Sequence, residues 1–179
     1  AFGAQTYYLY LTYHGAYHDI KTSEQPIVLI LGSGAYSIGS SVEFDWCAVT
    51  TARQMRKLGQ TVAMINSNPE TVSTDYDESD RLYFEQLTFE RISDIAEFEN
   101  LAGIVVSVGG QIANNLAMNL FKAGFKILGT HPEKIHQAVD GRRRHLDVTA
   151  PREREKVRPG CGRLQVMRRH QVLAPEGDG

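Results

Sequence analysis

The chain has 179 residues, of which 42% are hydrophobic and 22% are charged. This balance is typical of a soluble globular protein and excludes collagen-like, disulfide-stapled and wholly disordered chains. The net charge of −2 is the sum of two unlike parts: residues 1–140 carry 9 Lys and Arg against 16 Asp and Glu, and residues 141–179 carry 10 against 5. The second part has no Phe, Tyr or Trp. We therefore expect residues 141–179 to be a basic tail without a core, in a disordered state.

Residues 1–25 form a lead-in segment that is unusually rich in tyrosine. The stretch 6–13 consists of β-forming residues and is followed by loop residues around Gly15 and at 23–26. Because the segment is too short to fold alone, we expect it to pack on the following domain or on a neighbour outside this chain. The start at Ala1, without an initiator Met or a basic leader, indicates an internal fragment.

Residues 26–140 alternate between apolar runs and helical patterns. The runs at 27–31 and 61–65 are unbroken, which is typical of strands buried on both faces. The predicted strands are 27–31, 61–65, 103–108 and 126–128, and the predicted helices are 41–58, 88–99, 110–123 and 132–139. This order predicts an α/β fold, a Rossmann-like three-layer domain with a parallel sheet covered by helices on both faces.

The helix predicted at 41–58 has apolar residues at helical spacing, which indicate its buried side. These residues are Val42, Trp46, Val49, Ala52 and Met55. The two cysteines form no CxxC pair, so neither a disulfide scaffold nor a zinc site is expected. We expect Cys47 to be a small buried hydrophobic residue and Cys161 to be an incidental thiol.

No metal site and no membrane span are expected. The six histidines form no ligand set with cysteines, and the acidic stretch 75–80 lacks the glycine and the closing glutamate of a calcium loop, so it is interpreted as a solvated face. No apolar run approaches the roughly 18–20 residues that a bilayer requires. A reducing, soluble compartment is the default, cytoplasmic or alternatively mitochondrial.

Glycine-rich loops follow the first and third predicted strands, where α/β sheets bind ligands. The first contains Gly32, Gly34 and Gly39. It fails the dinucleotide pattern GxGxxG because position 37 is Ser, it fails the P-loop pattern, and Asn66 stands where an acidic ribose-binding residue is expected. A tight turn and a ligand cradle both remain open. The second loop contains Gly109, Gly110 and Gln111, with two asparagines downstream.

Acidic residues flank the same predicted edge of the sheet. Glu43 and Asp45 open the helix after the first glycine loop, and Glu70 lies in the long polar loop after the second strand. Acids in a first helical turn stabilise the helix dipole, which accounts for one of them. Two of them beside a loop suited to anions favour a functional role as well.

Taken in order, these loops resemble one family closely. The segment GSGAYSIGSSVEFDWCAV at 32–49 is similar to the second-half signature of the carbamoyl phosphate synthetase large subunit, in its eukaryotic form. The segments NPETVSTDYD, DRLYF, SVGGQ and LGT, which begin at 68, 80, 107 and 128, follow at the family's spacing. The tyrosine-rich lead-in resembles the stretch that precedes that half, so the resemblance covers about residues 4–141.

The resemblance implies a fold and a role. The large subunit has two homologous halves, each with a pre-ATP-grasp domain followed by an ATP-grasp domain; the first half makes carbamate from bicarbonate and ammonia, and the second phosphorylates carbamate with a second ATP. Residues 26–140 resemble the pre-ATP-grasp domain of the second half. The positions that match its substrate tunnel and wall are Ser41, Glu43 and Glu70, and no position matches a catalytic residue. A polar, water-poor passage suits labile carbamate.

Two departures limit what the resemblance implies. Ser37 stands where the second-half motif has Arg or His, and serine cannot replace a cationic contact. The resemblance also stops near residue 141, before the ATP-grasp domain that holds ATP and Mg in the family, so we expect this chain to be inactive alone. The residues from Arg142 onward suggest a shifted reading frame or an unrelated fused exon, which the other two frames of the source gene would test.

Partners and pathway stay open at this point. The expected partners are the missing ATP-grasp domain, the other synthetase domains and a glutaminase domain or subunit; glutamine and ammonia dependence, and the pyrimidine, arginine and urea pathways, are not distinguished. The alternative is a non-catalytic interaction protein whose arginine clusters touch nucleic acid, although the interspersed acids and the lack of aromatic residues make this the weaker hypothesis. A nicotinamide-dependent dehydrogenase is disfavoured by the failed GxGxxG.

Overall fold

The computed structural model describes residues 8–36, 42–138 and 164–169. Its strands are β1 Tyr8–Tyr13, β2 Ile27–Leu31, β3 Thr61–Ile65, β4 Arg81–Tyr83, β5 Leu101–Val105, β6 Ile127–Leu128 and β7 Leu164–Arg169. Its α-helices are α1 Val42–Lys57, α2 Phe89–Phe98 and α3 Gly110–Lys122, with a 3-10 turn η1 at Val72–Thr74 and a further helix at 132–138. The strands form one sheet in the order β6-β5-β2-β3-β4-β1-β7.

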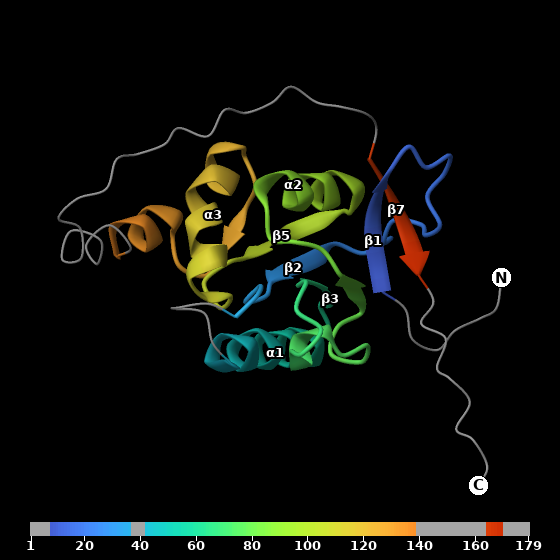
Figure 1. Cartoon of the computed structure of the whole chain (residues 1–179). Helices are drawn as coiled ribbons and strands as arrows, with labels where there is room; N and C mark the ends of the chain where they lie inside the picture. Colours follow the sequence, from blue (N-terminus) through green and yellow to red (C-terminus); the bar gives the residue numbers. More distant parts are fainter. Residues whose placement is uncertain (1–7, 37–41, 139–163, 170–179) are drawn as a thin grey trace, which may run out of the picture.

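The sheet is the middle of three layers, as the sequence predicts (Figure 1). Neighbouring strands from β6 to β1 are parallel, and only β7 runs antiparallel to its neighbour. Helix α1 covers one face, and α2 and α3 cover the other. The apolar strands are therefore buried on both sides, which is why their sequences do not alternate with polar residues.

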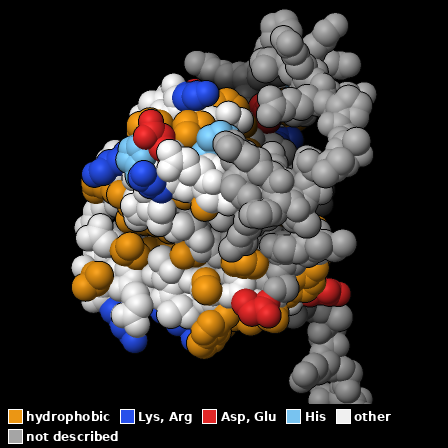
Figure 2. All heavy atoms as spheres, turned by 90° about the vertical axis from the view of Figure 1, so that its left-hand side faces the viewer, with side chains coloured by type: hydrophobic (Ala, Val, Ile, Leu, Met, Phe, Trp, Pro, Cys, Tyr) orange, Lys and Arg blue, Asp and Glu red, His pale blue; other side chains and the backbone are white. Residues whose placement is uncertain are grey.

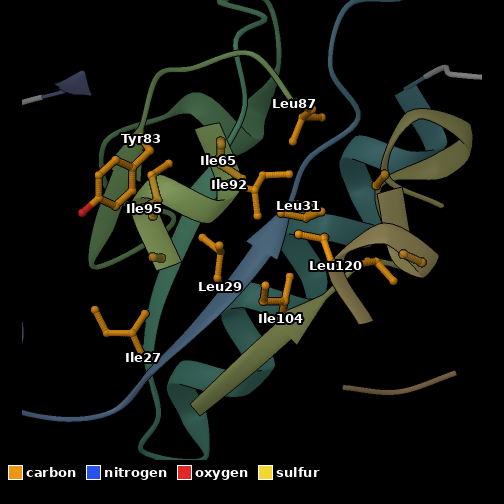
Figure 3. Close-up of a cluster of buried hydrophobic side chains, with 14 of the residues drawn as sticks. Ile27, Leu29, Leu31, Ile65, Tyr83, Leu87, Ile92, Ile95, Ile104 and Leu120 are labelled. Atoms are coloured by element: carbon orange, nitrogen blue, oxygen red, sulfur yellow. The ribbon is translucent and has the colours of Figure 1, made fainter. Parts of the chain in front are cut away.

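Successive residues of β2 supply two separate hydrophobic clusters. Leu29 and Leu31 point to the α2 and α3 side and pack with Leu120 (Figure 3), together with Ile92 and Ile95 of α2. The intervening residues point to the α1 side, where Val28 and Ile30 join Ala48 and Ala52. This alternation follows from the period of two along a strand, and it fixes the register of the sheet against both helical layers.

The tyrosine-rich lead-in joins this same sheet. Strand β1 pairs in parallel with the short β4, and Leu9 is 1% exposed in the larger cluster. The backbone N–H of Phe84 donates to the carbonyl of Leu9 at 2.8 Å. Beyond the end of β4, the Glu85 carboxylate accepts from the N–H of Leu11 at 2.7 Å, so a side chain continues the ladder. The lead-in strand therefore packs on the domain that follows it in the chain, which is one of the two partners expected from the sequence.

Strand β5 begins and ends earlier than the predicted 103–108. It pairs with β2 from Leu101 and leaves the ladder after Val105, with a register shift between the partners of Ile27 and Val28. Gly103 therefore lies in the middle of the strand and not at its start. A Cβ added at this position would lie 2.7 Å from the Leu128 side chain. The glycine is thus explained by close packing against β6 rather than by a turn.

Helix α1 buries a different side from the one that its apolar spacing predicts. Val49 and Ala52 are buried as expected, but Val42 and Trp46 are 63% and 61% exposed. The prediction is wrong at these two positions because Asp45, at 2% exposed, takes the buried side of the first turns. Cys47 is likewise exposed, so its prediction as a buried hydrophobic residue is also wrong.

Part of the C-terminal tail is described, and it forms a strand. All six residues of β7 pair with β1 in antiparallel register (Figure 1). The prediction of a disordered tail is therefore wrong for these six residues. The disorder predicted for the tail cannot be compared at residues 141–163 and 170–179, which lie outside the described residues. Among the described residues, no helix combines the length and apolar character that crossing a membrane requires.

Candidate functional site

The loops singled out in the sequence meet at the carboxyl edge of the sheet. The chain leaves β2 at Gly32, β3 at Asn66 and β5 at Val106, and these three strands are neighbours. Figure 2 faces this end of the molecule, where hydrophobic side chains are spread over the surface and acidic side chains lie among them. In parallel α/β sheets this edge is where ligands bind, so it is the candidate site.

Asn66 fastens the first glycine loop to the loop after β3. Its Oδ1 accepts from the N–H of Gly34 at 3.0 Å, and its Nδ2 donates to the hydroxyls of Thr71 and Ser73 at 3.2 and 2.8 Å. The side chain is fully buried. A Cβ on Gly32 would lie 2.8 Å from it, so glycine is required there for the asparagine to approach. Asn66, which stands where a nucleotide-binding fold has its ribose-binding acid, therefore holds the two loops together.

The second glycine loop packs directly on the first. A Cβ on Gly109 would lie 2.4 Å from the carbonyl oxygen of Gly32 and 2.5 Å from that of Leu31, distances that no side chain tolerates. Gly110 starts α3 with a φ of +74° and carries the Phe44 ring against its backbone. Close packing therefore accounts for these glycines without a ligand, against backbone at Gly109 and against the side chains of Asn66 and Phe44 at Gly32 and Gly110. Gln111 next to them donates to Asn115 at 2.7 Å on the exposed surface.

Asp45 joins α1 to the polar loop after β3. Its carboxylate accepts from the N–H of Val72 at 2.9 Å and from the N–H of Ser73 at 3.2 Å. These two N–H groups open the 3-10 turn η1, where the backbone has no partner of its own. A buried carboxylate with two amide donors is satisfied without a cation, which explains how Asp45 can lie in the interior.

This contact places two of the predicted wall residues in one neighbourhood. Glu43 is two residues before Asp45 in the first turn of α1, and Glu70 is two residues before Val72. Both side chains are exposed, and the N–H of Glu70 donates to the Asn68 side chain at 3.0 Å. The third predicted wall residue, Ser41, and the glycine at position 39 lie outside the described residues.

A group of acids continues from this loop, as the sequence indicates. The pKa of Asp75 is raised, first by partial loss of solvent and then by the neighbouring charges of Asp77, Glu78 and Asp45. Glu78 is paired with Arg53 of α1. Within the described residues, no group of three or more His, Cys, Asp or Glu side chains is arranged to hold a metal ion.

The described residues of the first glycine loop are occupied by contacts within the chain. The glycine loop that a nucleotide phosphate would approach is filled by the Asn66 side chain and by the second glycine loop. The acids of α1 and of the polar loop offer no metal-binding set in the described part of the chain. The described arrangement is a polar surface beside exposed apolar residues, with Tyr36 and Val72 at 45% and 43% exposed in addition to those of α1.

Sequence reasoning identified the loops but missed what holds them. In the sequence, Asn66 shows only that a nucleotide motif is incomplete, and Asp45 is only one of two acids at a helix start. Apart from the adjacent Ser67, whose N–H donates to Asn66, their hydrogen-bond partners lie 5 to 32 residues away in the chain. The signal that could have found them is polarity at positions that follow buried strands or lie on the inner side of a helix, where a partner is obligatory.

Comparisons with known proteins identify a family for this part of the chain. Residues 24–137 match the family model of the carbamoyl phosphate synthase preATP-grasp domain. The chain is 58% identical over 139 residues to the carbamoyl phosphate synthase arginine-specific large chain of Cutaneotrichosporon cutaneum, covering 78% of this chain and 12% of that protein. It is 57% identical over 135 residues to the multifunctional protein CAD of Squalus acanthias, covering 75% of this chain and 6% of that protein.

A third relative is the mitochondrial carbamoyl-phosphate synthase [ammonia] of Rattus norvegicus, with 58% identity over 135 residues, 75% of this chain and 9% of that protein. The chain thus spans only a small part of each of these relatives, which contain further domains. The family match extends from the loop before β2 to the helix at 132–138 and includes every described loop of the candidate site. The chain belongs to the carbamoyl phosphate synthase preATP-grasp domain family.

Proposed function

We propose that this chain is the preATP-grasp part of the second, carbamoyl phosphate-forming half of a carbamoyl phosphate synthase. In this role it forms one wall of the site and tunnel through which carbamate reaches its phosphorylation, with Ser41, Glu43 and Glu70 on the wall. ATP and Mg bind on the ATP-grasp domain of the full-length protein, and the other synthetase domains, with a glutaminase part or free ammonia as nitrogen source, are its partners.

The observation that carries the proposal is the Asp45 contact with η1. It joins the first turn of α1, which carries Glu43, to the polar loop after β3, which carries Glu70. A wall must keep its shape while a labile substrate passes, because carbamate that escapes into water decomposes. Hydrogen bonds from a buried carboxylate to two backbone amides provide such rigidity.

The exposed outer side of α1 supports the second part of the proposal, a missing neighbour. Val42 and Trp46 are one helical turn apart and both are more than 60% exposed. Adjacent large apolar side chains on a helix surface favour contact with another protein surface. In the full-length synthase this neighbour is proposed to be the ATP-grasp domain, which brings the nucleotide to the wall.

The test is a chimera that uses the full-length enzyme. Residues 24–137 replace the matching segment of the arginine-specific large chain of Cutaneotrichosporon cutaneum, and three quantities are measured: bicarbonate-dependent ATP hydrolysis, carbamoyl phosphate formation, and ATP synthesis from ADP and carbamoyl phosphate. The first reports the first half of the enzyme and the third reports the second half. Ser37→Arg in the chimera tests whether the missing cation limits the second half.

The chimera is expected to retain ATP hydrolysis, and Glu43→Gln and Glu70→Gln are expected to lower carbamoyl phosphate formation by roughly tenfold or more. The ATP consumed per carbamoyl phosphate formed then rises, because carbamate is lost before phosphorylation. Glu97→Gln, at an exposed position of α2, is the matched control and should change nothing. If the two wall variants change neither the yield nor the ATP stoichiometry, the assignment of the wall is wrong.

The isolated chain provides an independent check. Calorimetric titration of the 179-residue chain with Mg-ATP should show no binding at micromolar concentrations, since the phosphate-transfer machinery is proposed to lie on another domain. Micromolar binding by this chain alone would contradict the proposal that nucleotide binding belongs to the ATP-grasp domain. The role of Glu43 and Glu70 would still be tested by the chimera, because that experiment does not depend on where the nucleotide binds.

A further inference from the structure

We propose that the outer edge of β1 is a strand-pairing surface. In this chain residues 164–169 occupy it, and when they are displaced it pairs with β1 of a second copy. The inference concerns the edge of the sheet opposite β6 and does not depend on the proposed function. It rests on the register of β1 and β7, on the hydrogen bonds that β1 makes on its other side, and on the composition of the two strands.

The hydrogen bonds of β1 divide its backbone into two sides. The carbonyl of Leu9 and the N–H of Leu11 face β4 and its continuation, where they pair with Phe84 and Glu85. Because backbone groups of successive residues in a strand face opposite sides, the N–H and C=O groups of Tyr8, Tyr10 and Thr12 face the outer edge. Without a partner strand these groups would form an open template for pairing.

The composition of β1 makes this edge prone to association. Its sequence, YLYLTY, is made of β-forming residues with no charge, proline or glycine. Six-residue segments of this kind pair readily with copies of themselves when exposed on an edge. None of the usual edge protections, such as a lysine, a proline or a bulge, is present in the strand.

Strand β7 supplies the protection that β1 lacks. All six residues of β1 have a partner in β7, from Tyr8 opposite Arg169 to Tyr13 opposite Leu164. The outermost strand of the sheet is then LQVMRR, which carries two adjacent arginines. Positive charge on an edge strand opposes further pairing, so the sheet ends in a strand that resists association.

The tail can reach β1 of its own chain. Residues 139–163 connect the helix at 132–138 to β7. Fully extended, a segment of this length spans roughly 80 Å at about 3.3 Å per residue, about twice the diameter expected for a domain of this size. Pairing within one chain does not depend on protein concentration, whereas pairing between two chains does, so dilute conditions favour the pairing of β7 with β1 of its own chain.

Displacement of β7 has a definite geometric consequence. An edge strand can pair antiparallel with the same strand of another molecule about a twofold axis, and this closes the sheet edge of both molecules at once. Two copies of β1 joined in this way would form one continuous sheet across a dimer. The dimer is therefore the expected product when the β7 backbone is prevented from pairing.

The first experiment tests the register in the full chain. In a background with Cys47→Ser and Cys161→Ser, Thr12→Cys is combined with Gln165→Cys, its direct partner. Directly opposed residues have Cα atoms about 5.5 Å apart, which suits a disulfide. The matched control combines Thr12→Cys with Arg168→Cys, three positions out of register. An intrachain disulfide is expected, by mass spectrometry after mild oxidation, in the first pair only; equal yields in both would overturn the pairing.

The second experiment separates pairing from mere sequence change. Met167 lies opposite Tyr10, whose backbone groups face outward, so the N–H of Met167 faces β1 and that of Val166 faces away. Met167→Pro removes a ladder donor, whereas Val166→Pro, the matched control, is tolerated on an edge strand. Met167→Pro should lose amide-exchange protection at Tyr8, Tyr10 and Thr12 and should dimerise at micromolar concentration in sedimentation equilibrium; Val166→Pro should do neither.

A Met167→Pro chain that stays monomeric would overturn the proposal, and so would equal dimerisation of both proline variants. If Met167→Pro lowers the folded fraction, as judged by circular dichroism, the disulfide pair decides, since it needs no destabilised variant. The criterion is then whether the cysteines at positions 12 and 165 form a disulfide within one chain.

Discussion

Two buried carboxylates, Asp45 and Glu99, hold this domain together at different places and by different means. Asp45 accepts only from backbone amides of η1 and fixes the shape of the carboxyl edge. Glu99 lies beyond the other end of the strands, and one of its oxygens accepts from two side chains: the Nη1 of Arg81 at 2.6 Å and the hydroxyl of Tyr83. One carboxylate shapes a local surface, and the other ties distant segments.

The Glu99 cluster, defined by Glu99, Arg81 and Tyr83, also reaches the lead-in. The second oxygen of Glu99 accepts from the N–H of Ser23 at 3.2 Å, and Arg81 donates to the carbonyl of Lys21 at 2.8 Å. The loop that connects β1 to β2 is thereby fastened over the end of the sheet. The comparison of the two carboxylates shows that the tyrosine-rich lead-in is held by the Glu99–Arg81 ion pair as well as by the pairing of β1 with β4.

The largest effect is expected at Glu99. Glu99→Ala removes the acceptor for Arg81 and Tyr83 and leaves a partly buried cation without its partner, which should cost about 3–5 kcal/mol of the free energy of unfolding. Urea unfolding measures this cost, and Glu97→Ala, at an exposed position near the end of α2, is the control and should cost under about 0.5 kcal/mol. Equal effects of the two variants would show that the Glu99 cluster does not hold the lead-in.

A smaller and more local effect is expected at Asp45. Asp45→Asn turns one acceptor oxygen into a donor that faces an N–H of η1, which should cost about 2 kcal/mol. Amide exchange should accelerate at Val72 and Ser73 while β1 stays protected, whereas Glu70→Gln should leave exchange unchanged. Loss of protection throughout the sheet would contradict a local role for Asp45.

The smallest effect concerns alkaline pH. Burial, and then the charge of Glu99, raise the pKa of Tyr83 above its ordinary value of 10.0. Above about pH 10 the unfolded chain therefore releases the Tyr83 proton while the folded chain retains it, and stability falls as pH rises, by up to about 1.4 kcal/mol per pH unit. Tyr83→Phe removes this contribution, so its free energy of unfolding should fall less steeply between pH 9 and about pH 11.

Other tyrosines and the lysines titrate in both proteins, so the difference between the two slopes isolates Tyr83. Urea midpoints across this pH range provide the measurement. Identical slopes for the two proteins would mean that the Tyr83 hydroxyl ionises as readily in the fold as in the unfolded chain. The hydrogen bond to Glu99 would then not restrain it.

The parts of the fold that sequence predicts best are those determined by burial alone. β2 and β3 match their predicted bounds residue for residue, because strands covered on both faces are continuous apolar runs. The start of α2 was also predicted, since the Thr88 hydroxyl accepts from the N–H of Arg91 in a local cap. Each of these signals is complete within a few residues of sequence.

The parts that sequence could not predict depend on contacts between distant residues. β4 has three residues, too few for a periodic signal, and is defined by its neighbours β3 and β1. Helical spacing marked Trp46 as buried, but the buried side of α1 is set by the acceptors that η1 requires 27 residues later. Similarly, nothing local in LQVMRR indicates that it pairs with β1.

The exposed position of Trp46 has an experimental consequence. The sequence has a single tryptophan, and it lies on the outer side of α1 rather than in either hydrophobic cluster. Its emission therefore reports the polarity around that helix surface and is a poor measure of whether the interior is folded. A blue shift on mixing with another domain would signal coverage of α1, while denaturation should be followed by circular dichroism instead.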